Sequence, residues 1–225
     1  PTFFANSSTG NKYSLWVNVY GVSERYLNVY GEKDLRAQMN QFFHRTYTHP
    51  VDGTTLDMKM LCNWYWYDET AILETGKGTK DWNFYRYAET LLSAAEAIAQ
   101  SSGVNAEAAG YLAQVKARAN MEGKDVSTIA SELQRLGKQA FIEECWKERL
   151  REFPLEMKIW DDCVRTGKFP QISATNKGEV QFVDLIGSKN GSGATFKATD
   201  LYWPIPVNEI QRNPNLTQNE GYSAK

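Results

Sequence analysis

Little in this sequence indicates metal, redox or nucleic-acid chemistry. Its 225 residues include three cysteines and two histidines. Cys62, Cys145 and Cys163 form no CxxC pair and have no histidine at the spacing of a zinc site. The formal net charge is only −2, so the chain lacks the basic surface of a nucleic-acid-binding protein. We therefore predict buried structural cysteines, no metal, no cofactor and no nucleic-acid partner.

Long apolar runs are also missing. No stretch of about 18 apolar residues occurs, which argues against a membrane-spanning helix. The first residues, Pro1-Thr2-Phe3-Phe4, include neither a signal peptide nor an initiator methionine, which predicts a processed or truncated piece of a longer protein. A hydrophobic content of 42% and an aromatic content of 13% predict a packed globular body of one large domain or two small ones.

The most prominent aromatic run is Trp64-Tyr65-Trp66-Tyr67, within an irregular, aromatic-rich segment at residues 1–80. In a strand, Trp64 and Trp66 would share one face, and Tyr65 and Tyr67 the other. One pair would then pack in the core and the other would be available to a ligand. Sugars bind proteins by stacking their C–H faces on such rings. These four residues are our candidate ligand-binding residues, with burial in the core as the alternative.

Residues 81–166 form the predicted helical part. In two segments, apolar residues recur at three- and four-residue steps. They are Phe84, Tyr87, Ala88, Leu91, Leu92, Ala95 and Ile98, followed by Ala108, Leu112, Val115 and Ala119. Gly103 is expected to end the first helix, and Asn105 to cap the second. This predicts one αα-hairpin of the tetratricopeptide type, which should stack on further chain because one unit cannot bury both of its faces.

A further helix is predicted to begin near Ser127. Gly137 weakens its middle, so the segment is either one helix or two. Pro154 should kink the chain or start a new helix. Residues 167–200 then form a loop-rich insertion, in which residues 180–186 either pair as a short strand or lie over the core.

An acidic ladder follows within the helical part. Glu148, Glu152 and Glu156 are spaced i, i+4, i+8 and so lie on one helix face. Paired carboxylates are typical of glycoside hydrolases, in which two acids flank the scissile bond. The alternative, which we favour, is a structural ion-pair network in which nearby cations neutralise the ladder. The cations expected from their position are Arg149, Arg151 and Lys158.

Residues 201–225 are predicted to be an ordered C-terminal strap packed onto the body. Pro204 and Pro206 bias the chain toward an extended conformation, and Asn213-Pro214 is typical of a turn. A disordered tail would be poor in apolar residues. The strap instead contains Tyr202, Trp203, Ile205, Ile210 and Leu216.

Four motifs occur in order along residues 30–222. They are Asp34-Leu35-Arg36; the segment 86–97, which begins Arg86-Tyr87-Ala88-Glu89; the segment 148–165, which begins Glu148-Arg149; and the tail with Pro204-Ile205-Pro206 and Gln218-Asn219-Glu220-Gly221-Tyr222. This series resembles the SusD/RagB family of nutrient-binding, glycan-capturing lipoproteins of the Bacteroidetes outer membrane. Ile159 and Cys163 depart from the family pattern, which has Arg and Leu there.

The resemblance implies a mainly α fold of tetratricopeptide-like αα-hairpins, with long irregular loops and a few short strands, forming the C-terminal part of a longer protein. It implies a binding protein, not an enzyme, which captures oligosaccharides or other nutrients at the cell surface. The implied partner is a SusC-like TonB-dependent transporter, and the implied membrane attachment is a lipid anchor absent from this chain. A helical-repeat scaffold that binds proteins is the alternative, and a glycoside hydrolase is a third.

Overall fold

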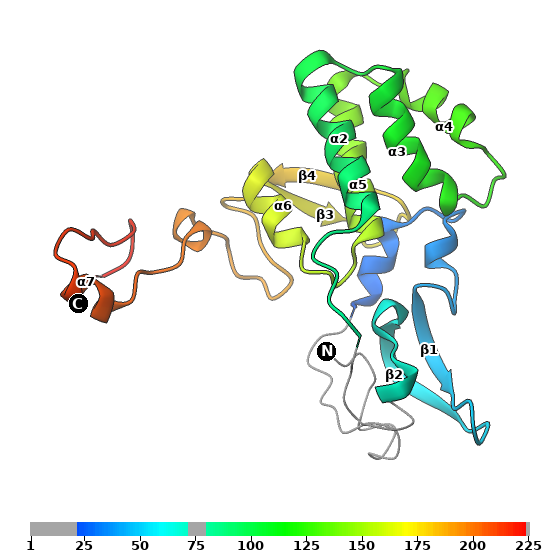
Figure 1. Cartoon of the computed structure of the whole chain (residues 1–225), viewed down its shortest axis with the longest axis horizontal. Coiled ribbons are helices and arrows are strands. Elements are labelled where there is room, and N and C mark those ends of the chain that lie inside the picture. Colours follow the sequence, from blue (N-terminus) through cyan, green and yellow to red (C-terminus); the bar gives the residue numbers. More distant parts are fainter. Residues whose placement is uncertain (1–21, 72–79, 224–225) are drawn as a thin grey trace. The chain divides into compact units, whose positions relative to one another are not determined.

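The computed structural model describes residues 22–71 and 80–223 (Figure 1). The chain divides into two compact units. The first runs to residue 158 and includes residues 172–180, and the second consists of residues 159–171 and the chain from residue 181. Helices dominate and the strands are few and short, which confirms the predicted fold class. Within the described ranges, no helix is both long and apolar enough to cross a bilayer.

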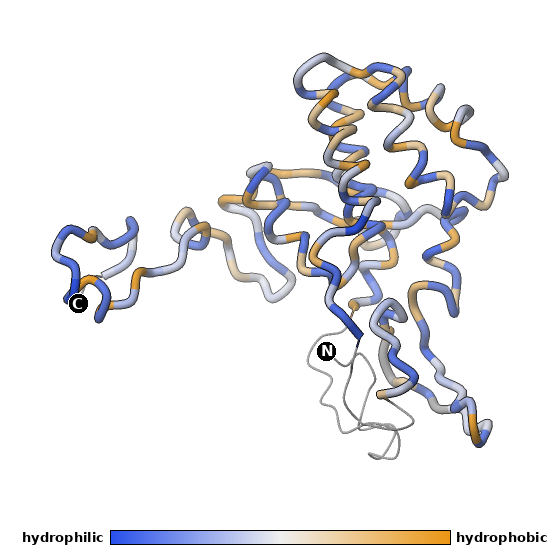
Figure 2. The backbone as a smooth tube through the Cα atoms, in the orientation of Figure 1, coloured by the Kyte–Doolittle hydropathy of each residue, from blue (hydrophilic) through white to orange (hydrophobic). Residues whose placement is uncertain are grey.

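The first unit is built around four helices, α2 (Tyr87–Ser102), α3 (Ala106–Arg118), α4 (Val126–Leu133) and α5 (Lys138–Glu152). Helix α3 packs between α2 and α4, and α5 packs against α2 (Figure 1). Figure 2 shows hydrophobic and hydrophilic residues alternating along these helices, as expected of amphipathic helices. Their apolar faces meet in one core, which includes Leu92, Ala95, Leu112, Ala113, Ile129, Leu133, Phe141 and Ile142. The chain itself therefore supplies a partner helix for each member of the predicted αα-hairpin.

The ends of these helices follow local sequence chemistry, with two exceptions. Gly103 ends α2 with φ of 82°, and the Asn105 side chain accepts a hydrogen bond from the backbone N–H of Ala108 at 2.9 Å, as predicted. Asp125, not Ser127, caps α4. Helix α2 begins at Tyr87, and the Tyr87 side chain is 72% exposed, so its assignment to the apolar face is wrong.

Removal of the Asn105 cap should measurably weaken the αα-hairpin. We expect Asn105→Ala to lower the free energy of unfolding by about 1 kcal/mol, because one backbone donor at the start of α3 loses its acceptor. Asn105→Asp is the matched control, since a carboxylate oxygen also caps a helix. Urea denaturation followed by circular dichroism measures both variants. Equal midpoints for Asn105→Ala and the wild type would contradict this role.

Glycine and proline separate the later helices. The predicted third helix is two helices, because α4 ends at Leu133 and Gly137 is the N-cap residue of α5. Helix α5 ends at Glu152, two residues before Pro154. Proline lacks a backbone N–H and cannot continue a regular helix, so the chain turns here before α6 (Ile159–Thr166) in the second unit.

The segment before the helices is more regular than the sequence predicts. It contains the 3-10 helices η1 (Glu24–Val29) and η2 (Leu35–Ala37) and an antiparallel pair, β1 (Phe43–Thr48) and β2 (Thr55–Asn63). The prediction of an irregular segment is wrong for this pair of strands. A register shift in β1 between His44 and Thr46 interrupts the strand alternation, which obscures the strand in the sequence.

The second unit contains α6, a two-stranded sheet of β3 (Lys168–Ile172) and β4 (Val180–Asp184), η5 (Ala198–Leu201) and α7 (Val207–Arg212). Of the two alternatives for residues 180–186, the short strand is therefore the observed one.

The C-terminal strap is ordered by hydrogen bonds within itself and to Thr199. The Gln218 side chain accepts from the backbone N–H of Ile205 and donates to its carbonyl oxygen, both at 2.8 Å. The Tyr222 hydroxyl donates to the carbonyl oxygens of Thr199 and Tyr202. Tyr202 and Trp203, predicted to pack, are instead 61% and 89% exposed. Side-chain-to-backbone bonds, not burial of these aromatic rings, order the strap.

Candidate functional site

The aromatic run at residues 64–67 is not a strand. It forms the 3-10 helix η3 (Trp64–Trp66), capped by the Asn63 side chain, which accepts from the backbone N–H of Tyr65 at 2.9 Å. With three residues per turn, the side chains of Trp64 and Tyr67 lie on the same side. Their rings stack with centroids 4.5 Å apart and planes 8° apart. The strand-based pairing of Trp64 with Trp66 is therefore wrong.

The four aromatic residues of the run differ in what their rings contact. Trp66 is 7% exposed and packs on Trp82 with centroids 4.4 Å apart, so it is a core residue. Trp64 stacks on Tyr67 and also on His44, whose ring centroid lies 3.7 Å away. His44 is thus a structural residue, and burial lowers its pKa.

Tyr65 lies apart from that stack. Its hydroxyl accepts a hydrogen bond from the Asn83 side chain at 2.8 Å, and the Arg86 guanidinium lies 5.6 Å from its ring centroid. The Lys80 ammonium lies 4.9 Å from the same centroid. Tyr65 is half-buried, as are Trp64 and Tyr67, but it is Tyr65 that has Lys80, Asn83 and Arg86 as neighbours.

An exposed group of aromatic side chains, not predicted from the sequence, lies next to Tyr65. Trp82, Phe84, Tyr85 and Tyr87, which we call the aromatic segment, are 36%, 74%, 81% and 72% exposed. Lys158 supports this segment, because its ammonium donates to the carbonyl oxygen of Phe84 and lies 4.8 Å from the Tyr85 ring centroid. The signal was present in the sequence as W-N-F-Y-R-Y, but helical periodicity assigned Phe84 and Tyr87 to the core. Exposed aromatic groups of this kind mark binding surfaces.

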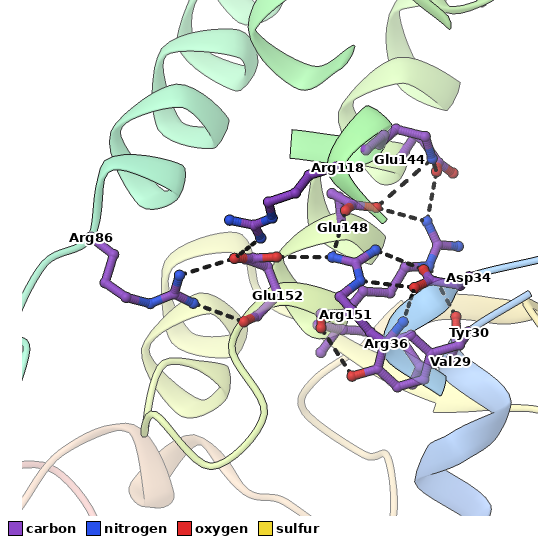
Figure 3. Close-up of polar contacts among 12 residues, drawn as sticks. Val29, Tyr30, Asp34, Arg36, Arg86, Arg118, Glu144, Glu148, Arg151 and Glu152 are labelled. Atoms are coloured by element: carbon purple, nitrogen blue, oxygen red, sulfur yellow. Dashed lines mark hydrogen bonds and ion pairs between the residues drawn. The ribbon is translucent and has the colours of Figure 1, made fainter. Parts of the chain in front are cut away.

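The acidic ladder is the centre of a buried ion-pair network (Figure 3). Glu152 has no exposed surface and its carboxylate meets three arginines. Nη1 of Arg36 and Nη1 of Arg86 each lie 2.9 Å from it, and the Arg118 guanidinium is the third partner. Three cations around one carboxylate offset the large cost of burying its charge.

Glu148 is held in a similar way one turn earlier on α5. It is 1% exposed and pairs with Arg36 at 2.8 Å, Arg151 at 3.2 Å and Lys116 at 3.8 Å. Burial alone would raise the pKa of this carboxyl, but the three cations outweigh burial and lower the pKa to about 2. Glu148 is therefore ionised at neutral pH.

Glu156 completes the ladder, and Arg86 joins it to the rest. The Arg86 guanidinium contacts both Glu156 carboxylate oxygens at 2.8 Å. Arg36 is anchored by Asp34, whose carboxylate accepts from its Nε and Nη2 at 2.9 and 2.7 Å. Three of the four motifs found in the sequence therefore contribute to one network, although they lie far apart in sequence. They are the motifs that begin at Asp34, Arg86 and Glu148.

This geometry excludes a glycosidase role for Glu148 and Glu152. Glu148 and Glu152 are enclosed by cations and have almost no exposed surface, so neither can reach a glycosidic bond. The structural interpretation is confirmed, but its partners were only partly predicted. Arg151 pairs with Glu148 as expected, whereas Arg149 and Lys158 pair with Glu89.

The cysteines behave as predicted. Cys62, Cys145 and Cys163 are free thiols in the core, and burial raises the pKa of Cys163 to about 11. Among the described residues, no three His, Cys, Asp or Glu side chains gather in a group that would hold a metal ion.

Comparison with known proteins agrees with the order of the motifs. The SusD family model matches residues 9–222. The chain belongs to the SusD family. The starch-binding protein SusD of Bacteroides thetaiotaomicron is 35% identical over 140 residues, which are 61% of this chain and 21% of that protein. A crystal structure of a SusD superfamily protein from Parabacteroides distasonis superimposes with a TM-score of 0.75 at 30% identity, covering 94% of this chain and 44% of that one.

The SusD family assignment confirms the resemblance that the four motifs indicate. The chain spans about a fifth of the length of the curated relative and less than half of the solved one. That relative is named as a starch-binding protein. The family assignment and the name of the curated relative agree with the prediction of a binding protein.

Proposed function

We propose that this SusD-family chain is part of a cell-surface protein that captures oligosaccharides or polysaccharides. We further propose that the protein delivers them to a SusC-like TonB-dependent transporter of the outer membrane, and that a lipid anchor outside this chain holds it there. Membership in the family and the starch-binding name of the curated relative support the carbohydrate ligand.

The observation that carries the proposal is the exposed aromatic segment beside Tyr65. Its rings are large apolar surfaces next to polar groups, as sugar binding requires: C–H faces stack on the rings and hydroxyls bond to the polar neighbours. Tyr85 is the most exposed of these rings, and Asn83 and Arg86 lie at Tyr65. We place the sugar contact at Tyr65 and Tyr85, with Trp64 and Tyr67 stacked nearby and Trp66 as support.

Affinity gel electrophoresis of the chain in gels containing starch, pullulan or pectin tests this contact. Tyr65→Ala and Tyr85→Ala should each weaken retention by about fivefold, the loss expected for about 1 kcal/mol of ring contact. Tyr202→Ala is the matched control, because Tyr202 is also exposed but lies in the second unit. Its retention should equal that of the wild type.

The proposed contact would be contradicted if Tyr65→Ala and Tyr85→Ala, like Tyr202→Ala, were retained as strongly as the wild type on a glycan that the wild type binds. No retention on any glycan, together with a stable complex with another protein, would favour the helical-repeat scaffold instead. Co-purification from outer membranes with a TonB-dependent transporter tests the delivery step separately.

A further inference from the structure

The turn at residues 153–158, which follows α5, has a strained backbone. Leu155 and Met157 both have φ of 59°. This left-handed region is uncommon for residues other than glycine, and a residue stays in it only where the surrounding contacts hold it. Burial of the Met157 side chain does not hold the turn, because that residue is 65% exposed. Other contacts of the turn therefore fix its conformation.

Two polar side chains of the first unit hold this turn. The Asn63 side chain, which is buried, donates to the carbonyl oxygen of Pro154 at 2.9 Å. Nε and Nη2 of Arg86 donate to the two carboxylate oxygens of Glu156, both at 2.8 Å, and Glu156 is 5% exposed. Asn63 and Arg86 both precede α2 in the chain, so the turn is fixed against the segment that leads into that helix.

Lys158, the last residue of the turn, contacts that same segment at three points. Its ammonium donates to the carbonyl oxygen of Phe84 at 2.6 Å and lies 3.1 Å from a carboxylate oxygen of Glu89 in α2. It also lies 4.8 Å from the centroid of the Tyr85 ring. Tyr85 nevertheless remains 81% exposed, so the ammonium covers only part of the ring and leaves surface open to a sugar.

We propose that Lys158 is a positioning residue for glycan binding, which holds the Tyr85 ring in place before the sugar arrives. This inference rests on the glycan contact proposed above. Residues 80–86 form no helix or strand, so regular secondary structure does not order this ring. A ring that must be ordered on binding lowers the affinity, and a contact that orders it in advance raises the affinity. Lys158 thus acts through Tyr85 and not on the sugar itself.

Affinity gel electrophoresis of Lys158→Met in gels containing starch, pullulan or pectin tests this role. Methionine keeps the length of the side chain and removes its charge. Retention should weaken about threefold, the loss expected when a cation over an exposed ring is removed. Lys158→Arg should retain binding, because a guanidinium also donates to a carbonyl oxygen and lies over aromatic rings. Lys138→Met is the matched control, since the Lys138 ammonium also donates to a backbone carbonyl oxygen, that of Gln100, but near the opposite end of α2.

Combination with Tyr85→Ala separates positioning from a general loss of stability. If Lys158 acts through Tyr85, Lys158→Met has no further effect once the ring is absent, and the double variant should be retained like Tyr85→Ala alone. Independent effects would instead multiply to a loss of about fifteenfold. A second measurement needs no glycan. The backbone ¹⁵N order parameter of Tyr85 should be about 0.85 in the wild type and in Lys138→Met, and below about 0.6 in Lys158→Met.

Each outcome decides the proposal. Full retention of Lys158→Met, where Tyr85→Ala loses binding, overturns the role of Lys158 alone. A fifteenfold loss in the double variant, or a Tyr85 order parameter that Lys158→Met does not change, also overturns it. If Lys158→Met does not fold, the wild type decides, because an order parameter below about 0.6 at Tyr85 means that the ring is not held in place. Full retention of Tyr85→Ala contradicts the glycan contact itself, so the failures of the two proposals are distinguishable.

Discussion

Glu152→Gln should lower the free energy of unfolding by about 3–5 kcal/mol, the loss that follows when one partner of a buried ion pair is removed. The Glu152 carboxylate has no exposed surface and compensates charge on Arg36, Arg86 and Arg118. Glutamine keeps the volume and removes the charge. Arg36, itself 5% exposed, would keep its other two carboxylates but lose this one.

Urea denaturation of Glu152→Gln beside Glu122→Gln measures this effect. Glu122 also pairs with a cation, Lys124, but its side chain is 47% exposed. An exposed pair contributes about 0–1 kcal/mol, so the control should change little. Arg118→Gln should fall between the two, because the Arg118 side chain is 56% exposed and its charge is partly hydrated. Similar unfolding midpoints for Glu152→Gln and Glu122→Gln would show that the network is not a main source of stability.

The sequence predicts the α2–α3 hairpin well because its determinants are local. Leu91, Leu92 and Ala95 follow the helical period and are buried, and Asn105 caps α3 as its side-chain chemistry requires. Tyr87 breaks the pattern because period alone does not show where a helix begins. The first residue of α2 has no preceding turn of helix to cover its ring, and the Tyr87 side chain remains exposed.

The partners in the ion-pair network could not be predicted from the local sequence. The i, i+4, i+8 spacing predicts that the ladder shares a face, and it does, yet the charges that neutralise Glu152 come from residues 36, 86 and 118. Spacing along the chain suggests only neighbouring cations as partners of the ladder carboxylates. Two of these cations, Arg149 and Lys158, pair with Glu89 instead. Contacts over such separations depend on how α2, α3 and α5 pack.

The aromatic residues show a second limit. A run of alternating Trp and Tyr suggests a strand because both residue types favour strands. The Asn63 cap and a three-residue turn produce η3 instead, so Trp64 stacks on Tyr67 and Trp66 enters the core. The exposed rings lie in the connection before α2, at Phe84 and Tyr85, where no period applies.

Acid should destabilise the first unit between about pH 5 and pH 2, and Glu148 should account for a large share of the loss. Its folded-state pKa of about 2 lies below the ordinary value of 4.5. A carboxyl with a depressed pKa contributes stability that is fully present above the unfolded pKa and disappears as the pH falls through the folded one. A difference of about 2.5 pKa units corresponds to about 3 kcal/mol.

Two other carboxyls modify this dependence. Burial raises and Lys116 and Arg151 lower the pKa of Glu144, with a net lowering, so it acts in the same direction as Glu148. Burial raises the pKa of Glu156 despite Arg86, so Glu156 acts in the opposite direction and offsets part of the loss. The expected curve is therefore a net decrease in unfolding free energy across the window, less steep than Glu148 and Glu144 alone would produce.

Urea denaturation at pH 5, 4 and 3 tests this dependence, with Glu148→Gln beside Glu122→Gln. Glu148→Gln should be less stable at pH 5 and lose less on acidification, because glutamine does not titrate, whereas Glu122→Gln should follow the wild type. If Glu148→Gln does not fold, the side-chain carboxyl ¹³C shift of Glu148 in the wild type gives the same answer. A midpoint near pH 4.5 in the folded protein would mean that Arg36, Lys116 and Arg151 do not outweigh the burial of this carboxylate, and the pH dependence would then need another origin.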